Sequence, residues 1–414
     1  MSSPPTPDLV ATIEVYIVNL RQDKPYLGSL RDGETVNESG YFVRRGNRTV
    51  YPRANRSLVV RVVTEDGVEG WGETYGLVAP KATAEIIHDL LAAFVIGRDP
   101  MDRETLHDEL YDLMRVRGYT GGFYLDALAG IDIALWDIAG KQTGESVAQL
   151  LGGRCRESIP AYVSGLPEDT LGARCDLAAS WQERGFDSFK FAMPVADQGP
   201  VRELEALRER LGEDARIASD LHWTYSKTEA VDLARQLAPY RPWFLEAPLP
   251  TEDIEGLSWV AENSGQTIAV GEEWRTVYDA RLRIDRRAAH IVQPEMGHTG
   301  ITQFMRICRY AESHHLHIIP HATIGAGIFL AASLQASATL RSVTSHEFQH
   351  SILEPFRHFT GNVLECENGA YSVPDTPGIG VAPSGDMRAN MELVSVTCSP
   401  FIGPQGVRES QPGH

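Results

Sequence analysis

The chain has 414 residues, a formal net charge of −18 and an ordinary globular composition, with 43% hydrophobic and 23% charged residues. This length allows one large barrel and a smaller domain. The acidic charge argues against a nucleic-acid surface, which needs a basic footprint, and no apolar stretch has the length of a membrane span. The first ten residues lack a signal-peptide core, and the five cysteines include no CxxC pair. We therefore expect a cytoplasmic protein with reduced thiols and neither nucleic acid nor membrane as a partner.

The N-terminal part begins with the alternation of apolar and polar residues that is typical of strands. Residues 11–20 and 57–76 both show this period, and Asp66-Gly67 inside the second run is a hairpin signal. Between the two runs, from about residue 22 to residue 56, lies a long polar segment that contains several tyrosines and arginines. A loop of this length inside a compact domain is usually functional or disordered. We interpret it as a mobile lid.

Helical periodicity follows the second strand-like run. Residues 81–97 and 102–116 carry apolar side chains three and four positions apart, which predicts two amphipathic helices. Residues 124–144 are almost entirely apolar apart from three aspartates. A helix this apolar is predicted to be buried between two partners and not to lie on a surface.

From about residue 156 the pattern changes to an alternation of short strands and amphipathic helices, which predicts a parallel sheet. The expected strands are 159–163, 188–191, 217–221, 243–246, 267–272, 290–295, 317–321 and 347–348. Eight short strands with about seven intervening helices are most simply accommodated by a closed barrel. The tail beyond Glu354 has few periodic runs, and we expect it to pack back on the first domain.

Three acidic residues, Asp220, Glu246 and Glu272, recur every 26 residues, and each closes a short apolar run. In a parallel barrel, side chains at the C-terminal ends of neighbouring strands converge on the axis. Three converging carboxylates repel one another unless a cation lies between them. Because all the ligand atoms are oxygen, the set favours Mg²⁺ over zinc. Solvated carboxylates at strand ends are the alternative, which the equal spacing disfavours.

Several further motifs resemble one known family. They are GIDIALWDIAGKQTGESVAQLLGG at residues 130–153, QPE at the sixth expected strand, PHA at the seventh and PGIGV near the end. Together with the three carboxylates, they resemble the enolase superfamily and, within it, the mandelate racemase subgroup. The resemblance covers nearly the whole chain.

The resemblance implies an α/β fold in which a (β/α)7β modified TIM barrel, residues 151–354, lies under an α+β capping domain. Residues 1–150 would form most of the capping domain, and residues 355–414 would pack back on it. The resemblance also implies bound Mg²⁺, a homo-oligomer, and removal of the proton α to the carboxylate of a small-molecule substrate. In this comparison Glu272 is the metal ligand, and the adjacent Glu273 supports it without binding the ion.

His321 and Glu295 match the family's base and its carboxylate partner. They end neighbouring strands, so the carboxylate can fix the imidazole tautomer and raise its basicity. The family usually has Asp where this chain has Glu295. Lys190 matches the first lysine of the family's K-x-K motif, but Ala192 replaces the second lysine, which is the base on the opposite face. We therefore interpret Lys190 as a group that binds the carboxylate or stabilises its charge.

His222 follows the first metal ligand by two residues, in the sequence DLH. This D-x-H arrangement resembles the galactonate and mannonate dehydratases, and the flanking sequence is more similar to the galactonate type. The resemblance implies that His222 protonates the departing 3-hydroxyl, because hydroxide is a poor leaving group. The alternative is a histidine that serves only packing or support of the site.

The remaining candidates concern substrate binding. Glu347 matches the family's acid that hydrogen-bonds the substrate carboxylate, with Glu354 as the rival. In the lid, Arg44, Arg45 and Tyr51 are candidates for binding a polyhydroxylated tail. Trp223 is a candidate for lining the pocket, with aromatic packing as the alternative. His298, in EMGHTG, is expected to cap the following helix more readily than to reach the site.

These residues favour a Mg²⁺-dependent acid-sugar dehydratase, a hydro-lyase that converts an aldonate such as galactonate to a 2-keto-3-deoxy sugar acid. A racemase, epimerase or sugar-lactone cycloisomerase is the alternative among enzymes. Epimerisation needs a base on each face of the substrate, which His222 and His321 together provide. A non-catalytic protein that binds sugar acids is the alternative outside enzymes, since a fold alone does not establish activity.

Overall fold

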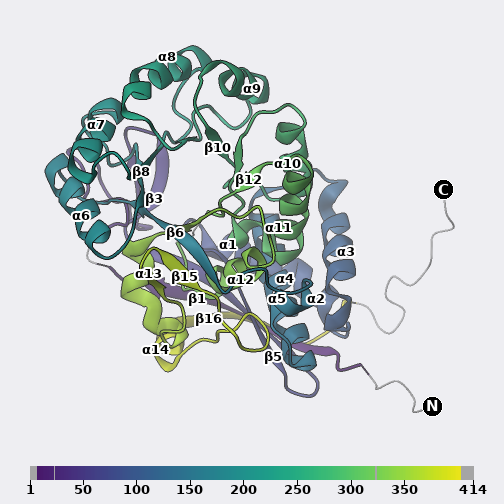
Figure 1. Ribbon diagram of the computed structural model, residues 1–414. Helices are drawn as coiled ribbons and strands as arrows, with labels where there is room; N and C mark the ends of the chain where they lie inside the picture. Colours follow the sequence, from purple (N-terminus) through teal and green to yellow (C-terminus); the bar gives the residue numbers. More distant parts are fainter. Residues whose placement is uncertain (1–6, 23, 322–323, 402–414) are drawn as a thin grey trace.

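The structure is a computed structural model that describes residues 7–22, 24–321 and 324–401. The remaining positions are residues 1–6, residue 23 in the predicted lid, residues 322–323, which include the alanine of the PHA motif, and residues 402–414 of the predicted C-terminal tail. These positions lie outside the described residues. Figure 1 shows the two parts of the molecule, a ring of strands and helices and, against one side of it, a sheet with its own helices. No helix within the described ranges is long and apolar enough to cross a membrane.

An antiparallel sheet forms the centre of the capping domain, and both ends of the chain contribute to it. The strand order is β16-β1-β4-β5. The bounds are Val10–Leu20 for β1, Asn55–Thr64 for β4, Glu69–Tyr75 for β5 and Met391–Thr397 for β16. The turn between β4 and β5 is the predicted Asp66-Gly67 hairpin, in which Gly67 has a φ of 84° that suits glycine. Because β16 pairs with β1, the tail lies against the N-terminal part.

Helices cover one face of this sheet. They are α1 (Pro80–Glu85), the π-helical turn η1 (Ile86–Leu91), α2 (Ala92–Val95), the 3₁₀ turn η2 (Pro100–Asp102), α3 (Arg103–Arg115), α4 (Gly122–Thr143) and α5 (Val147–Leu150). As its composition predicts, α4 is buried along most of its length, between β5 on one side and α11 of the barrel on the other. A Cβ atom on Gly72 of β5 would lie 1.8 Å from the carbonyl oxygen of Gly130 in α4, so only glycine permits this approach.

The predicted lid contains a small hairpin of its own. Strands β2 (Tyr41–Arg44) and β3 (Thr49–Pro52) pair with each other and with no other strand of the described residues. Phe42 and Tyr51 pack with Leu27 in a separate apolar cluster. The predicted lid therefore contains a hairpin with a small apolar core of its own, and its mobility stays a prediction.

Eight parallel strands form the barrel. They are β6 (Ser158–Gly165), β7 (Ser188–Ala192), β8 (Arg216–Asp220), β9 (Leu245–Glu246), β10 (Ile268–Val270), β11 (Ile291–Val292), β12 (His317–Ile318) and β13 (His346–Phe348). Neighbours along the chain pair in order from β6 to β12, and β13 returns to pair with β6. Between β12 and β13, Ile318 donates its N–H to Ser342 and accepts one from Thr344, which closes the ring.

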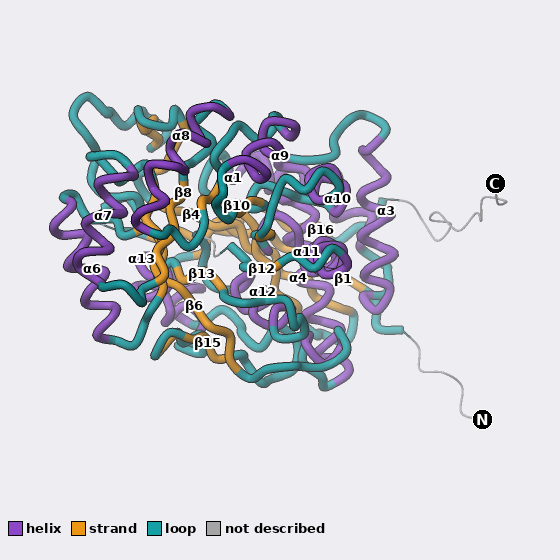
Figure 2. The backbone as a smooth tube through the Cα atoms, turned by 45° about the horizontal axis from the view of Figure 1, so that its top comes forward, coloured by secondary structure: helices purple, strands orange, loops and turns teal. Residues whose placement is uncertain are grey.

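Seven helices of the described residues connect these strands, which gives the (β/α)7β order. They are α6 (Leu171–Glu183), α7 (Pro200–Leu211), α8 (Lys227–Leu237), α9 (Ile254–Asn263), α10 (Val277–Ile284), α11 (Met296–Ser313) and α12 (Ile328–Ser337). A 3₁₀ turn, η3 (Ala238–Tyr240), extends α8. Figure 2 shows α6 to α9 on the outer side of the strands. The predicted fold class is confirmed.

The chain beyond β13 runs back towards the capping domain. It forms α13 (His350–Phe356), η4 (Arg357–Thr360), β14 (Cys366–Glu367), β15 (Ala370–Ser372) and α14 (Gly385–Ala389) before it reaches β16. Strand β15 pairs antiparallel with the first residues of β6, so this segment also contacts the barrel.

A buried carboxylate on β5 joins the capping domain to the barrel. Glu73 accepts hydrogen bonds from the backbone N–H groups of Ile328 and Phe329, at 2.8 and 3.1 Å, and from that of Ala326. These groups belong to the N-terminus of α12, whose dipole favours an anion there. Burial raises the pKa of Glu73, and the hydrogen bonds oppose that rise. The strand of one domain thus caps a helix of the other.

Replacing Glu73 by alanine should lower the free energy of unfolding by about 3 kcal/mol or more, because it leaves buried N–H groups without an acceptor. Chemical denaturation followed by circular dichroism would measure the change. Glu65→Ala, in the exposed turn of the same sheet, is the matched control and should change stability little. Equal midpoints for the two variants would contradict the role of Glu73.

Candidate active site

The predicted catalytic residues meet where the barrel strands end. Asp220 and Glu246 are the last residues of β8 and β9, while Glu272 and His321 follow β10 and β12. A cleft of about 350 Å³ opens here, between the barrel, the lid and the capping domain. The polar residues that line it are Asp126, Ser164, Lys190, Asp220, His222, Glu272, Glu273, Arg275, His298, His321, Glu347 and Gln349. Glu246 is not in the lining and is almost fully buried.

Lys190 lies at the bottom of this cleft between two carboxylates. Its Nζ donates to both oxygens of Glu246, at 2.8 and 2.9 Å, and lies 3.0 Å from Oε1 of Glu347. Burial lowers the pKa of Lys190, but the two carboxylates more than compensate and hold it well above its usual value. The side chain therefore stays protonated and acts as a cation, not as a base.

The carboxylates outnumber the cations. Asp220, Glu246, Glu272 and Glu347 converge around the single ammonium group of Lys190. Burial raises the pKa of Glu246, and the negative charges of its neighbours raise it further against the effect of Lys190. A divalent cation would remove this repulsion, and carboxylate oxygens are the ligands that Mg²⁺ prefers. The donor set thus fits the predicted metal.

Two of the three predicted metal ligands, Glu246 and Glu272, lie together with His321, whereas Asp220 contacts His222. Glu246, Glu272 and His321 each offer a ligand atom within 4.8 Å of the others. Asp220 is turned instead towards His222, whose Nδ1 and backbone N lie 3.0 and 3.1 Å from Oδ1 of Asp220. Glu273, beside Glu272, accepts a hydrogen bond from the indole of Trp274. Burial raises the pKa of Glu273 to about 7.

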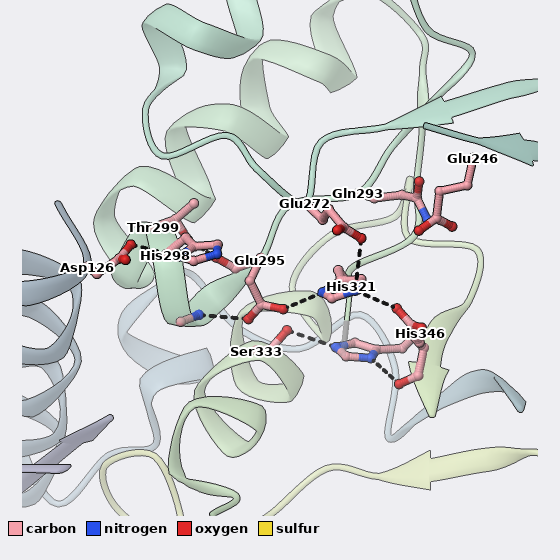
Figure 3. A network of polar contacts seen from close by, with 12 residues as sticks. Asp126, Glu246, Glu272, Gln293, Glu295, His298, Thr299, His321, Ser333 and His346 are labelled. Carbon is pink, nitrogen blue, oxygen red and sulfur yellow. Dashed lines mark hydrogen bonds and ion pairs between the residues drawn. The ribbon is translucent and has the colours of Figure 1, made fainter. Parts of the chain in front are cut away.

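His321 is held by Glu295 on one side and faces the cleft on the other, as Figure 3 shows. Its Nδ1 lies 2.7 Å from Oε2 of Glu295, which also caps α11 by accepting the N–H of Gly297 at 2.8 Å. Nε2 lies 3.0 Å from Glu272 and 3.5 Å from Glu347. Burial lowers the pKa of His321, but these carboxylates more than compensate and raise it well above its usual value. Glu295 thus fixes the imidazole so that its Nε2 faces the predicted metal ligand Glu272.

His222 occupies the turn after β8. His222 and Trp223 have φ values of 49° and 55°, in the left-handed region that side chains rarely adopt. Two consecutive residues of this kind store strain, which is common at functional sites. Burial opposes protonation of His222, yet Asp220 more than offsets it and raises its pKa. His222 therefore lies at the edge of the predicted metal site, in contact with Asp220.

The four predicted substrate-binding residues separate into two pairs. Tyr51 and Trp223 line the cleft. Arg44 is buried inside the lid, where its guanidinium donates to the carbonyls of Leu27 and Ser29 at 3.4 and 3.3 Å. Arg45 donates to the carbonyl of Gly33, also within the lid. Neither arginine is among the lining residues, because both satisfy backbone groups of the lid itself.

The structure also brings into the cleft one residue that was expected to lie outside it and two that the sequence did not single out. His298 lines the cleft. The helix cap that was expected to be His298 is Glu295. Arg275 and Asp126 line the same side, and Asp126 comes from α4 of the capping domain. An isolated acid within an apolar helix was the available signal for Asp126. Glu354, the rival of Glu347, is not in the lining and lies 3.5 Å from Arg184.

This arrangement of a barrel mouth with acids on successive strands, a histidine–carboxylate pair and a covering α+β domain defines an enolising barrel enzyme. Family models agree: the mandelate racemase/muconate lactonizing enzyme N-terminal domain matches residues 49–152, and the enolase C-terminal domain-like model matches residues 173–387. The chain belongs to the enolase superfamily, in the mandelate racemase subgroup.

Three similar proteins illustrate the relationship. D-galactarolactone cycloisomerase of Agrobacterium fabrum is 33% identical over 345 residues, which is 80% of this chain and 89% of that protein. D-galactonate dehydratase of Xanthomonas oryzae pv. oryzae is 30% identical over 367 residues, or 83% and 93%. A crystal structure of an enolase-superfamily member from Agrobacterium tumefaciens is 56% identical, with a TM-score of 0.91 over 94% of this chain and all of that one.

Mg²⁺ should stabilise the folded protein, because it binds the native carboxylates and not the unfolded chain. A hundredfold excess over Kd would add about 2.7 kcal/mol, visible as a rise in Tm that chelation reverses. Glu246→Gln should lose this rise without losing stability in the absence of metal, since it removes one repelling charge. Glu255→Gln, an exposed glutamate on α9, is the control. A full Mg²⁺ response in Glu246→Gln would contradict the ligand assignment.

Proposed function

We propose that this enzyme is a Mg²⁺-dependent acid-sugar dehydratase that removes the C2 proton of an aldonate and eliminates its 3-hydroxyl. The observation that carries the proposal is a pair of histidines at one acidic site, each oriented by its own carboxylate. Nδ1 of His321 is hydrogen-bonded to Glu295 at 2.7 Å. Nδ1 of His222 lies 3.0 Å from Oδ1 of Asp220, which accepts a hydrogen bond from the backbone N–H of His222. One histidine suits proton removal, and the other suits proton donation.

The first half of the reaction needs a base and strong charge stabilisation, because the proton α to a carboxylate is very weakly acidic. His321 takes this proton on Nε2, while its Nδ1–H group stays hydrogen-bonded to Glu295. A bound Mg²⁺ would stabilise the second negative charge that develops on the carboxylate oxygens. Lys190, kept protonated by Glu246 and Glu347, donates to the same end of the substrate.

The second half expels the hydroxyl group from C3. Hydroxide leaves only when a proton reaches it, so this step needs a general acid. His222 supplies that proton, since Asp220 stabilises its protonated form. The C2–H and C3–OH bonds break, water leaves, and the enol that remains becomes a 2-keto-3-deoxy sugar acid. The D-galactonate dehydratase relative makes galactonate the first substrate to test.

Lactone cycloisomerisation is the second candidate, because the relative that is 33% identical is a D-galactarolactone cycloisomerase. That reaction shares proton removal by His321, but the bond that breaks next is the C–O bond of the lactone, so the ring opens and its acyl group leaves as a carboxylate. A carboxylate is a good leaving group and needs no acid. The role of His222 therefore separates the two reactions.

His321→Asn should lower the rates of two processes by about 1,000-fold or more, because both need the base. They are C2 exchange with solvent deuterium and formation of the 2-keto product. The first step is to screen mono- and diacid sugars, with and without Mg²⁺, for 2-keto product, and to follow exchange by NMR. His314→Asn, an exposed histidine outside the cleft, is the control. Unchanged turnover in His321→Asn would disprove the mechanism.

His222→Asn should keep C2 exchange within a few-fold of the wild type while product formation falls by about 100-fold or more, because only the elimination step loses its acid. The same two assays measure both quantities on one substrate. If His222→Asn forms product at the wild-type rate, dehydration by His222 is wrong and lactone opening is favoured. Exchange without any loss of water in the wild type would indicate an epimerase.

A further inference from the structure

A third histidine–carboxylate pair, His298 with Asp126, lines the cleft away from the predicted metal ligands. Nδ1 of His298 lies 2.7 Å from Oδ1 of Asp126, and the same oxygen accepts a hydrogen bond from Nε of Arg275 at 2.9 Å. Figure 3 shows His298 beside Asp126, with Glu295 between it and His321. All three members of this cluster line the cleft. The reaction described above uses none of them.

The imidazole of His298 is held in one orientation. Its ring stacks on Tyr75 of the capping domain, with centroids 4.0 Å apart and an interplanar angle of 12°. Burial opposes ionisation of Asp126, but His298 and Arg275 more than offset it and lower its pKa. Asp126 therefore accepts the Nδ1 proton of His298 as a carboxylate. Nε2 is the ring nitrogen left to bind a ligand, and in the neutral ring it is an acceptor.

The first turn of α11 links this pair to the catalytic base. Glu295 is the N-cap of α11, and His298 follows three residues later. Gly300, with a φ of 63°, separates this turn from the rest of the helix, and a Cβ there would meet Asp132 of α4 at 2.6 Å. The same short turn therefore fixes both His321, through Glu295, and His298.

The charges on this side of the cleft cancel. Among the described residues that line the cleft, only Lys190 and Arg275 carry a fixed positive charge. Lys190 is paired with Glu246 and Glu347, and Arg275 with Asp126. A second carboxylate on the substrate would therefore meet no uncompensated cation, and its desolvation would be poorly offset. A neutral hydroxyl can donate to Nε2 of His298 and accept from Arg275 at little cost.

We propose that His298, held by Asp126, binds hydroxyl groups at the distal end of the substrate and selects a monocarboxylic polyhydroxy acid over the diacid of the same configuration. This inference rests on the proposed function, in which the carboxylate end of the substrate lies at Lys190 and the metal ligands. His298 is then a specificity-determining residue that contacts carbons beyond C3. The substrate class is an aldonate long enough to reach from the metal ligands to Asp126.

The test compares substrates of different length in one pair of variants. His298→Phe keeps an aromatic ring against Tyr75 and removes the nitrogen, while His298→Gln restores an acceptor. For His298→Phe, kcat/KM for a six-carbon aldonate such as galactonate should fall about 10-fold or more, chiefly through KM. The four-carbon aldonate, which lacks the carbons that the proposal places at His298, should change less than twofold. His298→Gln should recover part of the loss, and His314→Phe should match the wild type.

The wild type should also turn over galactonate at least 10-fold more efficiently than galactarate. Equal losses for His298→Phe at both chain lengths would overturn the inference, because His298 would then act on the reacting carbons or on folding. A wild type that prefers the diacid would overturn it as well. If the wild type acts on no sugar acid, the proposed function fails together with the inference. If the wild type is active and His298→Phe has the same kcat/KM for the six-carbon aldonate, the inference about His298 is wrong while the proposed function stands.

Discussion

The repulsion among buried carboxylates at the barrel mouth is the constraint on which the rest of the site depends. Asp220, Glu246, Glu272 and Glu347 surround one lysine, and Lys190 cannot neutralise all of them. A closed barrel holds these side chains together because each comes from a different strand that cannot move independently. The same rigidity that brings the charges together makes the site receptive to a divalent cation and to the developing anion of an enolised substrate. Folding free energy is thereby stored as electrostatic strain that binding relieves.

The capping domain contributes to this site through acids buried in one apolar helix. In α4, Asp132 accepts hydrogen bonds from the N–H and hydroxyl of Thr302, at 2.9 and 2.6 Å, and so fixes the start of α11. Asp137 accepts the N–H groups of Trp71 and Ile379, which ties the helix to its own sheet and to the C-terminal segment. Asp126, on the same helix, lines the cleft. The three aspartates thus fix α4 to different parts of the two domains, because each has different partners. Buried acids of this kind are tolerated only because every one is hydrogen-bonded.

Local pattern and spacing were sufficient to predict the barrel and the strand ends, but not the partners of each side chain. A period of 26 residues located Asp220, Glu246 and Glu272 correctly at three successive strands, because one βα unit has a nearly constant length. The contact of Asp220 with His222 depends on the left-handed turn after β8, which no sequence period reports. The lid arginines were predicted from charge alone, whereas their placement follows from backbone carbonyls inside the lid that need donors. His298 was expected to cap α11, yet Glu295 caps it, and only the three-dimensional position of Asp126 reveals what His298 binds. How the metal ligands are arranged around an ion stays a prediction.

The choice among related reactions depends on the leaving group, not on the shared enolisation. Both proposed reactions begin with the same proton removal, so His321 and its acidic neighbours do not distinguish a dehydratase from a cycloisomerase. The strained turn that holds His222 against Asp220 has an energetic cost, and a protein that expels a carboxylate has no need of an acid there. The cluster of His298, Asp126 and Arg275 also disfavours a diacid or its lactone. Either would bring a second acidic group, whose charge Arg275 would not compensate because it is already paired with Asp126. The contact of His222 with Asp220 and the pairing of Arg275 with Asp126 are thus the two features of the cleft on which the proposed choice of substrate depends.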